Sequence, residues 1–319
     1  MSTSRRRPLS VGPIRAFEAV SRHLSFRAAA DELSLTQSAI SRQIQSLEED
    51  MGATLLLRGT RKVELTQEGA MFLRALAPGL ARIDASVQQI RQSQGRRVVS
   101  VTTFASFASL WLIPQMEAFQ REHPEIDIRV SATDVIVNTS DPEFDLILRY
   151  TSPQRVTPDA QRLFGEVITP VISPWLAEQI RNGQAPPLSK PQHLSQYTLT
   201  EEDDNRPSAE FLSWRHWLAH HGAPEVQPRR WLYLNFTYQQ VQSALAGQGV
   251  ALARLPLVAE QLQSGDLVEP FGPEGRVATP LAYWLITPAN SRARKEVNEF
   301  CRWVEQRAAQ TRLALGEPG

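Results

Sequence analysis

The chain lacks the features that several common protein classes require. Cys301 is its single cysteine, so no disulfide or thiol-pair switch can form within one chain. No run of eighteen apolar residues occurs, which predicts that no helix spans a membrane. Motifs such as G-x-S-x-G, the phosphate loop and paired cysteines are missing, and no catalytic cluster stands out. We therefore do not expect an enzyme, a bound cofactor or a metal site.

No excess charge of either sign exists, because 34 basic residues balance 34 acidic ones. The distribution is uneven, however. Residues 1–97 carry 15 Lys+Arg and 9 Asp+Glu, a net charge of +6, which leaves −6 for the remainder. A basic N-terminal part on an acidic body is typical of a nucleic-acid-binding module joined to a second domain.

Residues 25–47 predict two short amphipathic helices. Ser25 can cap the first helix, in which apolar residues recur at helical spacing from Phe26 to Leu33. Four residues, Leu33 to Thr36, separate this pattern from the next, and Thr36 can cap the second helix. The second helix has an apolar face formed by Ile40, Ile44 and Leu47.

The other face of the second helix is polar, and its side chains can hydrogen-bond base edges and phosphates. The residues expected to contact DNA on this helix are Thr36, Gln37, Ser38, Ser41, Arg42 and Gln45. Two helices, a tight turn and a polar second helix predict a helix-turn-helix. Taken alone, the same pattern also fits an amphipathic helix pair whose charged face is only solvated.

The segment that follows favours DNA binding. R-G-T-R-K at 58–62 places Arg58, Arg61 and Lys62 close together, and an extended V-E-L-T pattern follows. A hairpin with a basic tip is what a wing beside a recognition helix requires for contact with phosphates or a minor groove.

The ordered motifs resemble those of a known family. They are R-A-F-E-A-V (15–20), L-S-F-R-A-A-A-D-E-L (24–33), T-Q-S-A-I-S-R-Q-I-Q-S-L-E-E (36–49), G-A-T-L-L-L-R (52–58) and L-T-Q-E-G (65–69). This series resembles the winged helix-turn-helix of LysR-type transcriptional regulators. The segments 111–130, 144–150 and 244–256 are similar to the effector-binding domain of that family. T-T-F-A-S (102–106), L-R-Y (148–150) and Y-W-L-I (283–286) look most like its AmpR/GcvA subgroup.

A connecting helix is predicted over residues 66–94. Its apolar residues are spaced alternately three and four apart, as in a coiled-coil seam, at Leu73, Leu76, Leu80, Ile83, Val87 and Ile90. The spacing favours a dimer, although a single helix lying on its own body remains an alternative. Pro78 is expected to kink this helix or to start a new one.

The body predicts an α/β fold. Strands are expected at 98–102, 126–130, 144–150, 167–172, 231–236, 250–253 and 282–286. Helices are expected at 106–121, interrupted at Pro114, and at 238–246 and 292–309, while 181–193 and 201–208 read as loops. This alternation predicts parallel sheets.

The resemblance implies a specific domain organisation. It comprises a winged helix-turn-helix over 1–66, a dimerisation helix over 67–95 and an effector-binding domain over 96–319 that resembles periplasmic binding proteins. Subdomain I would cover about 96–164 and 269–319, and subdomain II about 165–268. The chain would cross between them near 163–167 and 268–280.

A fold of this kind binds its ligand at strand ends and helix starts between the subdomains. Hydroxyls beside free helix N–H groups could receive a carboxylate there. The expected effector-binding residues are Thr102, Thr103, Ser106, Arg149, Tyr150, Asn235, Thr237 and Tyr283. The resemblance points in particular to Thr103, Thr237 and Tyr283. The alternative is that the hydroxyls only cap helices and that Tyr283 belongs to the core.

These features together predict a ligand-responsive transcriptional regulator. Its expected partners are operator DNA and a small effector such as a carboxylate, amino acid or peptide. The resemblance further implies a homodimer or homotetramer and contact with RNA polymerase. A solute-binding protein would explain only the body and would need an export signal. No apolar segment follows the N-terminal M-S-T-S-R-R-R-P, so a cytoplasmic location is expected.

Overall fold

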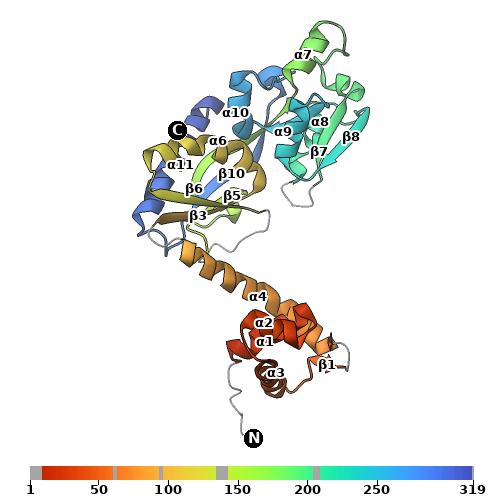
Figure 1. The fold of residues 1–319 in the computed structure, drawn as a ribbon. Helices are drawn as coiled ribbons and strands as arrows, with labels where there is room; N and C mark the ends of the chain where they lie inside the picture. Colours follow the sequence, from red (N-terminus) through yellow and green to blue (C-terminus); the bar gives the residue numbers. More distant parts are fainter. Residues whose placement is uncertain (1–8, 60–62, 93–95, 134–142, 204–208, 318–319) are drawn as a thin grey trace. The chain divides into compact units, whose positions relative to one another are not determined.

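The computed structural model describes residues 9–59, 63–92, 96–133, 143–203 and 209–317. The chain divides into two compact units, Met1–Gln94 and Gly95–Gly319 (Figure 1). The first unit consists of α1 (Val11–His23), α2 (Phe26–Leu33), α3 (Gln37–Met51), β1 (Leu56–Arg58), β2 (Val63–Leu65) and α4 (Gln67–Gln92).

The first unit folds around the apolar faces that its sequence predicts. Ile40, Ile44 and Leu47 of α3 are buried together with Phe17 and Val20 of α1. Ser25 and Thr36 cap α2 and α3, because their side chains accept hydrogen bonds from the backbone N–H groups three residues further on, Ala28 and Ala39. The predicted pair of short helices is therefore confirmed.

The turn between α2 and α3 is shorter than the sequence suggests. Leu33 is still helical, so only Ser34 to Thr36 separate the two helices. Ser34 adopts a left-handed conformation with φ of 54°, and Leu35 N–H donates to Ala30 O at 2.9 Å. The left-handed residue lets Leu33 complete the helix while the chain still reverses within three residues.

A two-stranded hairpin follows α3. β1 pairs antiparallel with β2 in a register that sets Leu56 opposite Leu65. At the start of α4 the chain returns very close to the hairpin, where a Cβ on Gly69 would lie 2.1 Å from Leu55 O. Glycine is therefore required at position 69. The predicted wing has the expected hairpin, although its tip at 60–62 lies outside the described residues.

α4 is one helix that contains Pro78, so no new helix starts there. Proline removes one backbone donor, which leaves the carbonyl of Arg74 without its helical partner. Arg74 and Pro78 are both exposed, and solvent can therefore hydrogen-bond this carbonyl.

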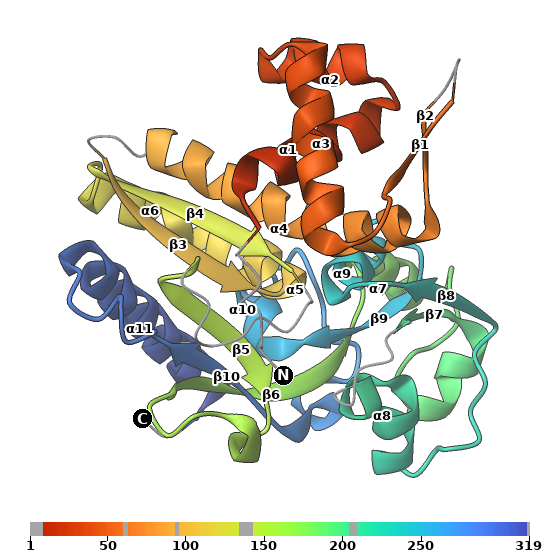
Figure 2. The ribbon, with the colours of Figure 1, turned by 90° about the horizontal axis from the view of Figure 1, so that it is seen from below.

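The second unit is built on one eight-stranded mixed sheet in the order β4-β3-β5-β10-β6-β9-β7-β8 (Figure 2). Its strands are β3 (Arg97–Thr103), β4 (Ile126–Ala132), β5 (Leu146–Thr151), β6 (Gln161–Val171), β7 (Thr198–Glu202), β8 (Arg230–Leu234), β9 (Val250–Arg254) and β10 (Val277–Ile286). Its helices are α5 (Ala105–Phe107), α6 (Ile113–Glu122), α7 (Pro174–Arg181), α8 (Trp214–His220), α9 (Thr237–Leu245), α10 (Leu255–Ser264) and α11 (Lys295–Leu315).

The expectation of purely parallel sheets is wrong for two strands. β3 is parallel to β4 and β5, and β7 is parallel to β8 and β9. β6 and β10 lie between these two groups, and they run antiparallel to each other and to their outer neighbours. These two long strands carry the chain from one parallel group to the other and back.

Two predicted loops and one predicted interruption also need correction. The stretch 201–208 begins with the last two residues of β7, and a 3₁₀ turn at Pro191–Gln196 overlaps the end of the stretch 181–193. The helical run from Ala105 to Glu122 continues through Pro114, because a π-helical turn at Ala108–Leu112 precedes it. A widened turn avoids the clash between a proline ring and the preceding carbonyl.

Candidate functional site

The polar face of α3 is open to solvent. Thr36, Gln37, Ser38, Arg42 and Gln45 are exposed, and Ser41 is half-buried. Thr36 Oγ1 lies 3.0 Å from Ser38 Oγ, and Arg42 Nε donates to Ser38 O at 3.4 Å. The opposite face carries Ile40, Ile44 and Leu47, so packing fixes the rotation of the helix and presents these polar groups outward.

Glu48 connects α3 to the hairpin. Its Oε1 accepts hydrogen bonds from Leu55 N at 2.7 Å and from Leu56 N at 3.2 Å. One side chain near the end of α3 thus fixes the backbone from which β1 starts. Of the predicted wing cations, Arg58 ends β1, whereas Arg61 and Lys62 lie outside the described residues.

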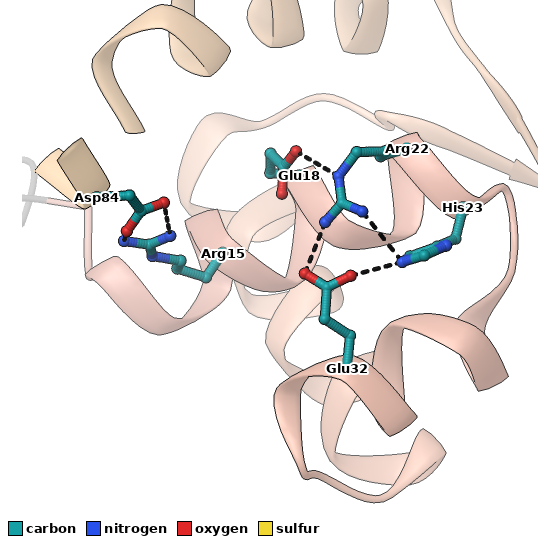
Figure 3. Close-up of polar contacts among 6 residues, drawn as sticks. All are labelled: Arg15, Glu18, Arg22, His23, Glu32 and Asp84. Atoms are coloured by element: carbon teal, nitrogen blue, oxygen red, sulfur yellow. Dashed lines mark hydrogen bonds and ion pairs between the residues drawn. The ribbon is translucent and has the colours of Figure 1, made fainter. Parts of the chain in front are cut away.

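Surface ion pairs join the helices that support α3 (Figure 3). Arg22 of α1 binds Glu18 at 3.1 Å and Glu32 of α2 at 2.6 Å, and His23 Nε2 lies 2.5 Å from Glu32. Hydrogen bonds from Arg22 and then from His23 lower the pKa of Glu32. Arg15 donates to both carboxylate oxygens of Asp84 in α4 through its two terminal guanidinium nitrogens, Nη1 and Nη2. Because these ion pairs are exposed, they add little to the free energy of folding, and their main effect is on the relative orientation of α1, α2 and α4.

In the second unit, strand alternation places three predicted effector residues on one face of the sheet. Tyr283 of β10 pairs with Tyr150 of β5, and their ring centroids are 5.0 Å apart. Val101 of β3 pairs with Leu146 of β5. Thr103 and Tyr150 follow these two residues by two and four positions, and alternate residues of a strand share a face, so both point to the same side of the sheet. Thr103 and Tyr283 are buried.

Two other predicted residues lie on the opposite face. Thr102 pairs with Ile147, and Arg149 pairs with Trp284, one position out of phase with Tyr150 and Tyr283. Burial lowers the pKa of Arg149. The structure therefore does not bring Thr102 and Arg149 together with Thr103.

The start of α9 places the remaining candidates. Thr237 is buried, whereas Asn235 is exposed and its N–H donates to Gln239 Oε1 at 3.1 Å. Ser106 Oγ accepts a hydrogen bond from Tyr238 N at 3.2 Å. The Ser106 hydroxyl is thus beside a helix N–H group as expected, but the helix is α9 and not the short α5 that contains Ser106.

Three charged residues, Glu166, Glu202 and Arg254, adjoin these candidates, and the sequence did not point to them as effector contacts. Tyr283 OH donates to Glu166 Oε2 at 2.6 Å, and Thr237 Oγ1 donates to Glu202 Oε2 at 2.6 Å. Arg254, at the end of β9, lies 3.9 Å from each carboxylate. Two predicted residues, Tyr283 and Thr237, therefore contact a buried cluster of opposite charges.

The buried position alters the acidity of these groups. Burial raises the pKa of Glu166 to about 7, against the opposing effect of Arg254 and the hydrogen bond from Tyr283. Burial and the nearby Glu166 raise the pKa of Tyr283 well above its ordinary value. Burial acts to lower the pKa of Arg254, but the surrounding tyrosines and carboxylates raise it, so Arg254 stays charged.

Glu201 and Glu202 belong to the stretch 201–208 that was expected to be a loop, but both have partners in the fold. Glu201 accepts a hydrogen bond from Trp214 N at 3.2 Å, and burial raises its pKa to about 7. Glu202 takes part in the charged cluster with Arg254. Both carboxylates lie at the end of β7, which the sequence pattern did not reveal.

The predicted seam of α4 has two parts. Leu73 and Leu76 pack against the core of the first unit, and Leu80 is 6% exposed. Ile83, Val87 and Ile90 are 52%, 39% and 66% exposed in the single chain. Three apolar side chains at coiled-coil spacing are therefore available to another surface.

Comparisons with known proteins match both units. Residues 12–70 match the model of the bacterial regulatory helix-turn-helix protein, lysR family, and residues 92–309 match the LysR substrate binding domain. The chain is 28% identical over 296 residues to the glycine cleavage system transcriptional activator of Escherichia coli, covering 93% of each. It is 32% identical over 302 residues to the transcriptional activator AmpR of Pseudomonas aeruginosa, covering 94% of this chain and 96% of that protein.

Solved structures agree. The effector domain of Pseudomonas aeruginosa AmpR is 27% identical with a TM-score of 0.52, covering 68% of this chain and 99% of that one. Vibrio fischeri DarR in complex with DNA shares the fold at 19% identity, with a TM-score of 0.61 and coverage of 94% and 99%. No helix in the described part of the chain is long and apolar enough to cross a membrane. The chain belongs to the LysR family as a DNA-binding transcriptional regulator with an effector-binding domain, and it is not an enzyme.

Proposed function

We propose that α3 reads operator DNA from the major groove. The observation that carries this proposal is the exposed polar face of α3, whose orientation is fixed by a buried apolar face and a capped N-terminus. Gln37, Ser38, Ser41 and Arg42 can reach base edges there, with Arg42 on a guanine or a phosphate. Thr36 and Gln45 extend the same surface, at the start of α3 and one turn beyond Ser41.

The hairpin supplies contacts of a different kind. Arg58, Arg61 and Lys62 bind phosphates or a minor groove, so they strengthen binding to all DNA sequences alike. Neutralising one of them lowers the slope of log affinity against log salt by about one unit per lost phosphate contact. An altered base preference with an unchanged slope contradicts this assignment.

The effector binds in the second unit, among Thr103, Tyr150, Thr237 and Tyr283. Thr103 and Tyr150 lie near the ends of β3 and β5, Tyr283 pairs with Tyr150, and Thr237 begins α9. Strand ends and helix starts are the usual ligand position in α/β folds. We give a secondary role to four further candidates. Thr102 and Arg149 are on the other face of the sheet, the Ser106 hydroxyl is used by α9, and Asn235 is exposed.

The regulator acts in the cytoplasm as a homodimer through α4. Pairing of effector domains would extend the dimer to a homotetramer. A ligand can change such an assembly only if it binds one arrangement more tightly than another.

The test of the DNA surface is the substitution Arg42→Ala. A DNA site is first selected from random sequence with the wild-type protein, and binding is then measured by fluorescence anisotropy at fixed salt. Loss of a specific contact should weaken binding by about 1–3 kcal/mol. Arg74→Ala on α4 is the matched control, because it removes the same charge from an exposed position of the same unit. Equal affinities for the two variants would refute the assignment of α3.

A further inference from the structure

One buried cation keeps unused hydrogen-bonding capacity. Arg254 is 3% exposed, and its Nε and Nη1 have no hydrogen-bond partner among the residues that the structure describes. The nearest carboxylate oxygens, on Glu166 and Glu202, are 3.9 Å away, which is beyond a hydrogen bond. The charge of Arg254 is therefore balanced, whereas its N–H groups are not satisfied.

The two carboxylates are held by other donors. Glu166 accepts from Tyr283 OH at 2.6 Å and from Val167 N at 3.1 Å, and Glu202 accepts from Thr237 at 2.6 Å. These contacts keep both groups at salt-bridge distance from Arg254. Buried donors are almost always paired in native proteins, and an unpaired one calls for a functional explanation.

The surroundings of Arg254 suit the body of an organic ligand. Its guanidinium lies 4.5 Å from the ring centroid of Tyr150 and 5.5 Å from that of Phe104. Phe104 directly follows Thr103, whose buried hydroxyl also lacks a hydrogen-bond partner within the described parts of the chain. The site thus combines unsatisfied cationic donors with aromatic surface.

The charge of the site limits the ligand. A guanidinium N–H donates a strong, charge-assisted hydrogen bond to a carboxylate oxygen, and the unpaired Nε and Nη1 of Arg254 can each donate one. Glu166 and Glu202 lie beside Arg254, so a dianion such as a phosphate monoester would be repelled more strongly than a monoanion.

We infer that Arg254 binds the carboxylate of the effector, and that the effector is a small organic acid with a single negative charge. This inference rests on the proposed effector site and adds the chemical class of the ligand and its anchoring residue.

The experiment compares acids with their neutral amides on the full-length protein. Acetate, propionate and benzoate are each titrated against acetamide, propionamide and benzamide, with thermal unfolding and calorimetric binding as readouts. We expect at least one acid, and not its amide, to raise the unfolding midpoint progressively with concentration. Arg254→Gln should weaken binding of that acid about tenfold or more, since it removes charged hydrogen bonds. The control Arg155→Gln, at an exposed position, should leave it unchanged.

Different failures point to different errors. If no acid is preferred over its amide, or if Arg254→Gln binds the acid normally, the inference is overturned. If Thr103→Val weakens the binding of a neutral probe and Arg254→Gln does not, the effector site stands and only the acidic character of the ligand is rejected. If neither Thr103→Val nor Arg254→Gln changes the binding of any probe, the effector site is rejected as well.

Removing Arg254 alone leaves two buried carboxylates without a counter-charge, which can unfold the domain. Arg254→Gln is therefore also made together with Glu202→Gln, which removes one positive and one negative charge. Arg254→Lys keeps the charge and removes the guanidinium N–H donors. Both variants should show the same loss of preference for the acid, and normal preference in either contradicts the role of Arg254.

Discussion

Glu166 illustrates how burial changes the chemistry of an ordinary carboxyl group. Water cannot solvate its charge, so its pKa rises to about 7 despite the neighbouring guanidinium of Arg254. The charge of the cluster formed by Arg254, Glu166 and Glu202 therefore changes near neutral pH. A residue that reads as a plain surface acid in the sequence becomes the pH-sensitive member of the site.

This shift predicts a pH-dependent stability. Between pH 4.5, the ordinary pKa, and about 7, the folded protein binds more protons at Glu166 than the unfolded chain does. The free energy of unfolding should therefore fall as pH rises through this window, by on the order of 3 kcal/mol from this group. Glu166→Gln, which mimics the protonated acid, should flatten the dependence when thermal midpoints are measured from pH 5 to 8.

Glu201 also has a pKa near 7, so part of the slope should remain in Glu166→Gln. Glu117→Gln removes an exposed carboxyl from the same unit and should leave the slope as in the wild type. A wild-type protein whose stability does not decline over this range would contradict the protonation assigned to Glu166.

Part of the proposed effector site could be predicted from the sequence, because some of its residues depend on local signals. Thr103 and Thr237 stand where a strand ends or a helix begins, and such positions can be recognised from periodicity. Arg254 and Glu166 become functional candidates only through pairing of strands far apart in the chain. Arg254 ends the apolar run V-A-L-A-R, where a charge normally marks only the return to the surface.

At the scale of elements, the attachment of the hairpin to α3 depends on one side chain. Glu48→Ala removes the acceptor for the N–H groups of Leu55 and Leu56, both of which lie in partly buried backbone. Leaving them unsatisfied should destabilise the first unit by about 1–3 kcal/mol. It should also weaken binding to specific and non-specific DNA alike, because the wing loses its fixed position.

The measurements are thermal unfolding and anisotropy with the selected and a scrambled DNA. Glu49→Ala is the matched control, because it removes an adjacent exposed carboxylate of α3. If Glu48→Ala and Glu49→Ala lose equal stability and equal affinity, the hydrogen bonds of Glu48 do not position the wing.

Elements with a clear period were predictable, and those shaped by tertiary contacts were not. The faces of α3 and the strand β5 follow from spacing alone. β7 was missed because T-L-T-E-E ends in carboxylates that find buried partners only in the fold. Pro114 was expected to interrupt a helix because sequence does not reveal the π-helical turn before it.

At the scale of the whole molecule, the charge distribution separates a basic N-terminal part from an acidic body, and the two family models match these two parts. The mixed character of the sheet could not be predicted, because β6 and β10 have the composition of any buried strand. Their antiparallel direction follows from long-range topology.

The apolar side chains of α4 predict dimerisation. Leu80 is only 6% exposed in the single chain, whereas Ile83 is 52% exposed, so Ile83→Asp should leave the monomer folded while placing a charge in the seam. Sedimentation should then show monomers where the wild type shows dimers, and footprinting should show loss of the paired half-sites. Ala81→Asp, an exposed position off the seam, should keep both properties. An Ile83→Asp protein that stays dimeric with a complete footprint would place the dimer contact elsewhere than on α4.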